Sequence, residues 1–374
     1  MPEPLHVCLL HDYRERGQTS MRLYAEHLGD ALAGHGVRVE RVRPPEVIPE
    51  RLRRPWALDR LDSYWGRFVR YPRIARRLRA DVYHVVDHGQ GFLVRHLDPA
   101  RTVVTCHDVI LLALAAGRIP GGPRPPRVAT AILRRAVAAM SRARFVVAVS
   151  ESTRRDLADL AGIDPDRVRV IPPGLNHPFR PDAGSREETR RRLGLPDGPI
   201  VLHVGQTGFY KNVEGCLRVV ARLRAGGLPV TLARAGQRLR PAQAALAERL
   251  GVAGDVRDLG PLSPEDLAAL YAASDVLLFP SLYEGFGWPP LEAMASGLPV
   301  VSSRAGALGE LVDGAALTAE PEDAPRLAEH VATMLTVPAT AERFRAVGAV
   351  RASGFEWGRT AAQWLALYRE AAGI

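Results

Sequence analysis

Lysine is almost absent from this chain of 374 residues. Of its 50 basic residues, only Lys211 is a lysine and the rest are arginines. We infer that arginine has replaced lysine wherever any cation suffices, and that position 211 resists the exchange. The two side chains are not interchangeable where a compact ammonium approaches a phosphate as a point charge. Two alternatives stay open for Lys211: a chance survivor on a solvated surface, and a lysine that forms a Schiff base with a cofactor.

Cysteine is also scarce. Cys8, Cys106 and Cys216 are far apart in apolar patterns, which provide neither a disulfide framework nor cysteine spacing typical of metal sites. No apolar run is long enough to span a bilayer, and the first residues do not resemble a signal peptide. We therefore expect a cytoplasmic protein in a reducing compartment, with peripheral attachment to the cytosolic face of a membrane as a further option.

Acidic residues are under-represented in the first half only. Residues 1–180 hold 30 arginines against 19 acidic residues, whereas residues 181–374 hold 20 basic against 22 acidic residues. The surplus positive charge of the first half predicts an anionic partner there, which is a membrane surface, a phosphate-linked acceptor or nucleic acid.

Short apolar runs alternate with helical patterns along both halves of the chain, which predicts an α/β fold with parallel sheets. We expect two facing Rossmann-like domains, residues 1–175 and 196–354, with ligands bound in the cleft between them. A Pro/Gly-rich passage at residues 172–199 is the expected linker, and an amphipathic helix at 355–374 is expected to pack back on the first domain. Expected strands are residues 5–10, 37–42, 82–86, 102–106, 145–149, 168–171, 200–204, 230–233, 276–279 and 299–302. Expected helices are residues 19–33, 212–224, 241–250 and 356–372, with others that open at Ser263 and at Pro321.

Residues 280–297, which read PSLYEGFGWPPLEAMASG, combine a strand end, a glycine-bearing loop and a helix that Pro289 or Pro290 opens. Gly285 and Gly287 let the backbone approach a ligand closely. The helix start, with its N–H groups and its dipole, suits an anion such as a diphosphate.

Two glutamates flank this loop. We expect Glu292 in the first helical turn, where it can accept hydrogen bonds from a ribose diol, and Glu284 at the other end of the same ligand. The alternative is that Glu292 only stabilises the helix N-terminus and Glu284 is a surface turn residue. The glycines and prolines between them favour the ligand-binding interpretation.

The segment resembles a known family. Glu284 and Glu292 match the Glu-x7-Glu signature of retaining, nucleotide-sugar-dependent glycosyltransferases of the GT-B fold, and the chain is similar to bacterial mannosyltransferase-like members of group 1. The run from Phe279 to Gly287 is very similar to the sequence that the family usually has at this place. The resemblance also covers Gly205 with Lys211-Asn212, the pair His107-Asp108, residues 150–154, residues 305–310 and Glu356-Trp357.

This resemblance implies a role for each matched residue. Lys211 would bind the diphosphate and neutralise charge on the leaving nucleoside diphosphate, Glu284 would contact sugar hydroxyls, and Glu292 the ribose. Phe286 and Gly287 would offer backbone donors, with Gly205 and Leu291 also lining the donor site, and His107 would face the transferred sugar from the first domain. No metal and no cofactor is expected besides the donor, a UDP- or GDP-linked sugar, because lysine, arginine and the helix dipole supply the positive charge.

The chain departs from the family pattern in one respect. The family commonly places an arginine directly after the glycine or directly before the lysine, where this chain has Gln206 and Tyr210. Arg234 or Arg238, after the next strand, would then supply the second cation, or the phosphate is held differently.

Residues 51–79 hold ten arginines interleaved with aromatic side chains. The spacing of Leu58, Leu61, Trp65 and Phe68 predicts an amphipathic helix, which either docks on its own domain or forms a membrane- or acceptor-binding surface. Nucleic acid is disfavoured, because no nucleic-acid-binding motif accompanies the arginines. His84, Asp87 and His88 are expected to cluster at a strand end, where they can touch an acceptor, and nothing nearby completes a metal site.

The sequence thus predicts a glycosyltransferase that moves a hexose-type sugar to a glycan or lipid-linked acceptor. Two other functions remain open: a nucleotide-sugar epimerase or a phosphorylase of the same fold, and a catalytically weak nucleotide-sugar- or glycan-binding protein. The donor base, the sugar, the acceptor and the oligomeric state are not readable from the residues.

Overall fold

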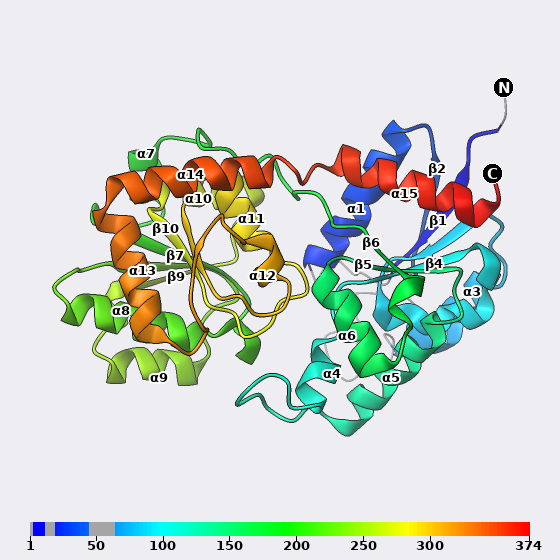
Figure 1. Ribbon diagram of the computed structural model, residues 1–374, viewed down its shortest axis with the longest axis horizontal. Helices are drawn as coiled ribbons and strands as arrows, with labels where there is room; N and C mark the ends of the chain where they lie inside the picture. The colour runs from blue at the N-terminus through cyan, green and yellow to red at the C-terminus, as the bar shows by residue number, and fades with distance from the viewer. Residues whose placement is uncertain (1–2, 12–18, 45–63) are drawn as a thin grey trace, which may run out of the picture. The chain divides into compact units, whose positions relative to one another are not determined.

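The computed structural model describes residues 3–11, 19–44 and 64–374. The chain divides into two compact units, each built on its own parallel sheet (Figure 1). Unit 1 comprises Met1–Ala116, Pro125–Asn176 and Glu356–Ile374, and unit 2 comprises Gly117–Arg124 and His177–Phe355. The predicted α/β class with two Rossmann-like sheets is confirmed.

The sheet of unit 1 has the order β2-β1-β3-β4-β5-β6, and all of its pairings are parallel. Its central strands are almost entirely apolar and buried, as expected for a sheet that is covered on both faces. Its strands are β1 (His6–Leu10), β2 (Arg38–Val42), β3 (Val82–Val85), β4 (Thr102–Cys106), β5 (Phe145–Ala148) and β6 (Val168–Val170).

The helices of unit 1 include the last helix of the described chain. α15 packs beside α1 (Figure 1), and its Tyr368 hydroxyl reaches the ring of His84 on β3. The α-helices are α1 (Thr19–Gly34), α3 (Tyr71–Ala75), α4 (Ile110–Ala115), α5 (Arg127–Met140), α6 (Glu151–Ala161) and α15 (Trp357–Ala372). Short π and 3-10 segments are η2 (Gly66–Arg70), η3 (His88–His96), η4 (Pro99–Arg101) and η5 (Pro165–Arg167).

The sheet of unit 2 has the order β12-β11-β10-β7-β8-β9, again fully parallel. Chain order reverses between β7 and β10, because β8 and β9 extend to one side of β7 whereas β11 and β12 extend beyond β10. In an open α/β sheet, such a switch point opens a crevice at the carboxyl ends of the strands. The strands are β7 (Ile200–Gly205), β8 (Thr231–Gly236), β9 (Val256–Gly260), β10 (Val276–Phe279), β11 (Val300–Ser302) and β12 (Leu317–Thr318).

Helix starts in unit 2 follow local chemistry. Ser263 caps α10 by accepting a hydrogen bond from the Asp266 N–H, and Pro264 fills the first helical position, as predicted. The α-helices are α7 (Arg186–Arg192), α8 (Val213–Ala225), α9 (Pro241–Arg249), α10 (Pro264–Ala273), α11 (Trp288–Ala295), α12 (Leu308–Leu311), α13 (Ala324–Thr336) and α14 (Pro338–Ala352). The 3-10 turns are η6 (Phe209–Lys211) and η7 (Ala253–Asp255).

Two expectations about elements were wrong, and three elements were not expected at all. The presumed linker at residues 172–199 contains the helix α7, whose Arg190 is buried and bonds to Asp275 and to the Ala273 carbonyl. The helix expected to open at Pro321 begins at Ala324, because Asp323 is its N-cap and accepts from the Arg326 N–H. The strands β9 and β12 and the helix α14 were not anticipated.

Among the described residues, no helix combines the length and the apolar character that a membrane crossing requires.

Candidate functional site

Lys211 and Glu284 meet at the switch point of the second sheet. Lys211 follows β7 in the turn η6, and Glu284 lies in the loop after β10. Lys211 Nζ lies 2.6 Å from Glu284 Oε1, and the two side chains are only 13% and 10% exposed. A largely desolvated ammonium at this edge of the sheet is positioned to meet an anionic group of a ligand.

Asn212 joins the two loops that carry this ion pair. It is the one non-glycine residue with a positive φ among the described residues, at 51°, and its Oδ1 caps α8 by accepting from the Gly215 N–H. Its amide nitrogen donates to the carbonyls of Pro280, at 2.9 Å, and Pro321, at 2.7 Å. The Leu282 N–H also donates to the Tyr210 carbonyl. Lys211 is therefore held by a network of bonds between the loops after β7 and β10.

Two aromatic rings flank the ammonium. Lys211 Nζ lies 5.3 Å from the ring centroids of both Tyr210 and Phe279, within the range of cation–π attraction. Tyr210 thus contacts the lysine with its ring at the position where the family pattern allows an arginine.

At the end of β7, the backbone of Gly205 lies very close to the backbone of Gly236 at the end of β8. Gly205 has a φ of 149°, and a Cβ at the neighbouring Gly236 would lie 2.3 Å from the Gly205 oxygen. Arg234, fully buried, donates to the carbonyls of Gly205 and Gln237, and burial lowers its pKa. The guanidinium of Arg234 therefore holds the strand-end loops together. Arg238 is exposed and donates to the Asp258 carbonyl.

The loop after β10 packs against the loop after β11. The Ala307 N–H donates to the Glu284 carbonyl at 2.9 Å, and a Cβ at Gly306 would lie 2.4 Å from that same oxygen. The Ser303 hydroxyl donates to the Ser281 carbonyl at 2.5 Å. These contacts fix the backbone on both sides of Glu284.

The helix α11 starts earlier than expected. Gly287 is its N-cap, with a φ of 114°, and the first helical residue is Trp288. Pro289 and Pro290 therefore occupy the second and third helical positions and present no N–H there, which reduces the donors expected at this helix start. Glu292 is the fifth helical residue, so its expected place in the first turn was wrong.

Glu292 is buried and hydrogen-bonded to a neighbouring helix. The Tyr271 hydroxyl on α10 donates to Glu292 Oε2 at 2.8 Å. Burial raises the pKa of Glu292 to about 7, and the hydrogen bond from Tyr271 partly opposes that rise. The carboxyl of Glu292 is therefore poised to change its charge near neutral pH.

The other sequence-selected residues of this segment are largely buried. Phe286 packs edge-on against Trp288 and Phe355, and the side chain of Leu291 is fully buried while its N–H bonds to the Gly287 carbonyl. These residues can meet a ligand only through the backbone, and Phe286 and Gly287 lie where the loop turns into the helix.

In unit 1, His107 lies at the carboxyl end of β4. Its Nε2 donates to the Val86 carbonyl at 2.9 Å, which sets the tautomer, and burial lowers its pKa, so the ring is neutral. Asp87 and His88, at the end of β3, lie 3.3 Å apart. Burial acts to raise the pKa of Asp87, but His88, the Gly89 N–H and His107 outweigh it, so the pKa is lowered. The predicted cluster at this strand end therefore contains Asp87 and His88.

His84 does not belong to that cluster, which corrects the expectation that it can touch an acceptor. Its Nδ1 and Nε2 lie 2.6 Å from the Tyr368 hydroxyl and 2.7 Å from Thr105 Oγ1. The ring is fully buried and stacks on Trp364, and burial lowers its pKa to about 3. His84 is thus a core residue that ties α15 to β3 and β4.

The arginine- and aromatic-rich segment is described only from residue 64 onward, so Leu58 and Leu61 lie outside the described residues. Trp65 is 56% exposed, which contradicts docking on its own domain at this position, whereas the partly exposed ring of Phe68 packs against Phe92 of the same unit, with ring centroids 5.2 Å apart. The buried residues of this stretch are instead Gly66, Tyr71, Pro72 and Ala75.

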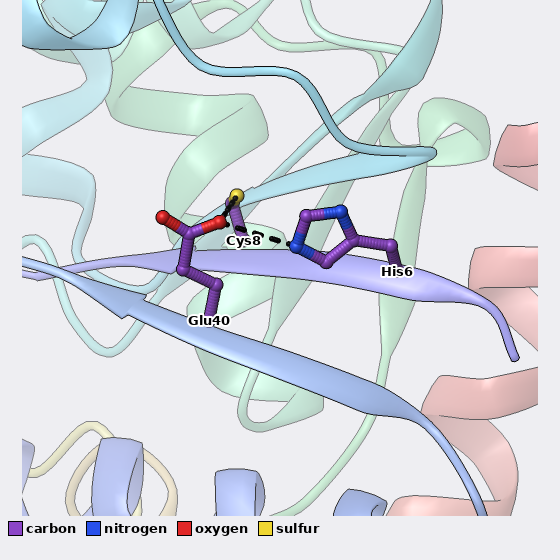
Figure 2. Close-up of side chains that lie close together, drawn as sticks. All are labelled: His6, Cys8 and Glu40. Carbon is purple, nitrogen blue, oxygen red and sulfur yellow. Dashed lines mark hydrogen bonds and ion pairs between the residues drawn. The ribbon is translucent and has the colours of Figure 1, made fainter.

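One group of side chains suited to metal binding occurs among the described residues: His6, Cys8 and Glu40 in unit 1 (Figure 2). The spacing of the cysteines alone did not reveal it. The alternation His6-x-Cys8 on a strand was the signal in the sequence, but Glu40 joins only through the pairing of β1 with β2. Burial, followed by the hydrogen bond to Glu40, raises the pKa of Cys8 to about 12.

Comparison with known proteins assigns the family. Residues 185–350 match the family described as glycosyl transferases group 1, and residues 21–178 match glycosyltransferase family 4. A D-inositol 3-phosphate glycosyltransferase of Acidothermus cellulolyticus is 38% identical over 236 residues, which are 58% of this chain and 51% of that protein. The chain spans about half the length of the curated relatives that it matches.

Solved structures share the fold along the whole chain. Sucrose-phosphate synthase from Thermosynechococcus elongatus has a TM-score of 0.78 at 21% identity, with 98% of both chains covered. Anabaena HepE in complex with UDP and glucose has a TM-score of 0.74 at 20% identity, with 98% of this chain and 100% of that one covered. Given these matches and the two parallel six-stranded sheets, the chain has the GT-B fold and contains a group 1 glycosyltransferase domain at residues 185–350 and a glycosyltransferase family 4 domain at residues 21–178.

Proposed function

We propose that the chain is a retaining glycosyltransferase that moves a hexose-type sugar from a nucleoside-diphosphate sugar to a glycan or lipid-linked acceptor, with no metal ion at the donor site and no further cofactor. The observation that carries this proposal is the largely buried Lys211–Glu284 pair at the switch point of the second sheet.

The donor diphosphate would bind to Lys211, whose ammonium neutralises the charge that develops on the leaving nucleoside diphosphate. Glu284 would then exchange part of its contact with Lys211 for the hydroxyls of the donor sugar. Glu292 would accept hydrogen bonds from the ribose, with Phe286 and Gly287 offering backbone N–H groups and Gly205 leaving space for the phosphates. Lysine and backbone donors would supply the charge that a divalent cation provides elsewhere.

From unit 1, His107 would face the transferred sugar. Its neutral ring, with the proton on Nε2 bonded to Val86, leaves Nδ1 as the acceptor nitrogen. Retention would proceed by attack on the face from which the nucleoside diphosphate leaves, because neither Glu284, paired with Lys211, nor Glu292, buried against Tyr271, is presented as a nucleophile.

The donor would be a UDP- or GDP-linked sugar, and structural similarity supports the UDP alternative only. The fold of this chain is shared with Anabaena HepE, which was solved with UDP and glucose. The acceptor would be a glycan or a lipid-linked sugar, and the surplus arginines of residues 1–180 favour an acceptor that carries phosphate or lies at an anionic surface.

The test is a panel of UDP-, GDP-, ADP- and dTDP-sugars, scored by the thermal shift of the full chain and then by release of nucleoside diphosphate. We expect one donor class to stabilise the protein and to be slowly hydrolysed, with release unchanged in excess EDTA. Release that EDTA abolishes and magnesium or manganese restores would refute the metal-independent mechanism.

A binding protein of weak activity is the second candidate. Gln206 and Tyr210 stand where the family places an arginine, and Arg234 is buried on backbone carbonyls. Stabilisation by a nucleotide sugar without any release of nucleoside diphosphate, with or without acceptor, would favour this candidate.

A further inference from the structure

The first strand of unit 1 brings two metal-binding residue types onto one face. Residues two apart on a strand point to the same side, so His6 and Cys8 of β1 share a face of the sheet. In the parallel register, Cys8 lies beside Glu40 of β2, whose carboxylate reaches across to both side chains (Figure 2).

The donor atoms converge on a small volume. His6 Nε2 lies 3.1 Å and Cys8 Sγ 3.3 Å from the same oxygen, Glu40 Oε2. All three ligand atoms lie within 4.8 Å of one another. Zinc bonds of roughly 2.0–2.3 Å in a tetrahedron place neighbouring ligand atoms about 3.3–3.8 Å apart. Small side-chain movements would therefore bring these three atoms to the corners of such a site.

The burial of the three residues leaves one open side. Cys8 is fully buried, whereas the side chains of His6 and Glu40 are 18% and 48% exposed. Because β2 is the edge strand of its sheet, Glu40 faces an accessible border. An ion can enter from that border, where a water molecule can complete the fourth position.

We propose that His6, Cys8 and Glu40 form a zinc site, with the imidazole nitrogen, the thiolate and the carboxylate as ligands. Nitrogen and sulfur ligands select zinc over magnesium and calcium, which prefer all-oxygen sites. On binding, the thiol of Cys8 loses its proton to solvent as the zinc–sulfur bond forms, and the His6 proton resides on Nδ1. The thiolate and the carboxylate then balance the two charges of the ion.

This site is separate from the proposed donor site. His6 and Cys8 are the first and third of the five residues of β1, whereas the sugar-transfer residues follow the carboxyl ends of strands. A bound ion would cross-link the edge strand β2 to β1 and thereby stabilise unit 1. The site would not take part in sugar transfer, so the zinc proposal and the proposed function can fail independently.

The test uses the full chain, freed of metal with a chelator and kept reduced. Isothermal titration with zinc should show one ion per chain, and Glu40→Gln and Cys8→Ser should each weaken the affinity at least about tenfold. With cobalt as the probe, the complex should show the intense thiolate-to-metal absorption band, and this band should disappear in Cys8→Ser.

Cys106→Ser is the matched control, because Cys106 is also a fully buried strand cysteine of the same sheet but donates to a backbone carbonyl. It should retain both the affinity and the cobalt band. If Cys8→Ser does not fold, the wild-type cobalt spectrum and the zinc affinity of Glu40→Gln decide. Absence of one-to-one binding, a cobalt complex without the thiolate band, or unchanged zinc affinity in Glu40→Gln would overturn the proposal.

Discussion

Lys211 combines three properties that arginine cannot reproduce together. Its ammonium is nearly buried, it forms a single short contact with Glu284, and it lies between the rings of Tyr210 and Phe279. The planar guanidinium is larger and distributes its charge over several donors, so it would not fit the same enclosed position. This geometry explains why one lysine persists in a chain that otherwise uses arginine.

Replacement of Lys211 tests this reading directly. We expect Lys211→Ala to lower kcat by about 100-fold or more, because the cation that stabilises the leaving group is removed. Lys211→Arg should restore little of the lost rate. Steady-state kinetics with the best donor gives the answer, and full activity of the Arg variant would contradict the role assigned to Lys211.

The buried carboxyl of Glu292 predicts a pH dependence of stability. Its pKa in the folded chain is about 7, raised from 4.5 by burial. Between these values the folded state retains a proton that the unfolded chain has lost, so this group's contribution to the free energy of unfolding should fall as pH rises from about 4.5 to about 7. Thermal unfolding across this window should show a steeper decline for the wild type than for Glu292→Gln. Parallel curves would refute the raised pKa.

The sequence predicted the roles of some individual residues but not their contacts in the folded chain. Lys211 and Glu284 were predicted as ligand-binding residues from their loops, but their direct contact depends on strand order, which no local pattern encodes. His84 was misassigned because it lies just before a strand end. Only the tertiary structure shows that both ring nitrogens are occupied inside the core, one by Tyr368 of α15, 284 residues away in sequence, and the other by Thr105 of β4.

At the scale of elements, Asn212 joins β7, α8 and the loop after β10. Asn212→Asp keeps the acceptor that caps α8 but removes the amide donor to the Pro280 and Pro321 carbonyls. We expect this change to destabilise unit 2 by about 1–3 kcal/mol, because two carbonyls lose their donor and face a carboxylate. Chemical denaturation followed by tryptophan fluorescence measures the effect. Asn212→Ala, which removes both the cap acceptor and the amide donor, should also be destabilised, and an Asp variant as stable as the wild type would contradict the role assigned to the amide donor.

Substitutions at Glu284 and at Glu292 should have different effects on the affinity for two ligands, the free nucleoside diphosphate and the sugar nucleotide. Glu284→Gln removes the carboxylate that occupies Lys211, so affinity for the free nucleoside diphosphate should be kept or increased, while affinity for the sugar nucleotide falls. Glu292→Ala should weaken both ligands, because the ribose is common to them. Calorimetric titration with each ligand distinguishes the two, and equal losses in both variants would contradict the assignment.

Element prediction succeeded where the local signals were strong. β4 and β10 were predicted with their observed ends because their β-branched or apolar runs are bounded by polar residues or by a proline. β9, which reads VRDLG, and the two-residue β12 carry too little apolar periodicity to be recognised. α7 was hidden by its charge, since its sequence REETRRR has no apolar face and the helix is held by the contacts of Arg190.

For the whole molecule, the charge asymmetry predicts salt-sensitive binding to anionic vesicles through unit 1. Arg51, Arg53 and Arg54 lie outside the described residues, and Arg67 is engaged with the Gly89 carbonyl. Nearby, Tyr64 and Trp65 are exposed, and α3 contributes Arg73.

Neutralising Arg70, Arg73 and Arg77 together should therefore reduce vesicle binding and leave nucleotide affinity intact. The control neutralises Arg249, Arg326 and Arg343 of unit 2, which should not affect vesicle binding. Co-sedimentation at low and high ionic strength measures both variants. No binding of the wild type to anionic vesicles, even at low salt, would exclude membrane attachment and leave the surplus charge to a soluble acceptor.

The path of the chain through unit 1 has a consequence for biosynthesis. The core of that unit is closed by α15, whose Trp364 and Tyr368 are fully buried against it. During translation, residues 3–176 emerge long before α15, whereas almost all of unit 2 is continuous between residues 177 and 355. The nascent first unit therefore lacks α15 until the second unit has been synthesised. During that time the imidazole of His84 and the apolar side chains around it have no contact with Trp364 and Tyr368. The part of the protein that is translated first is thus the last to be completed.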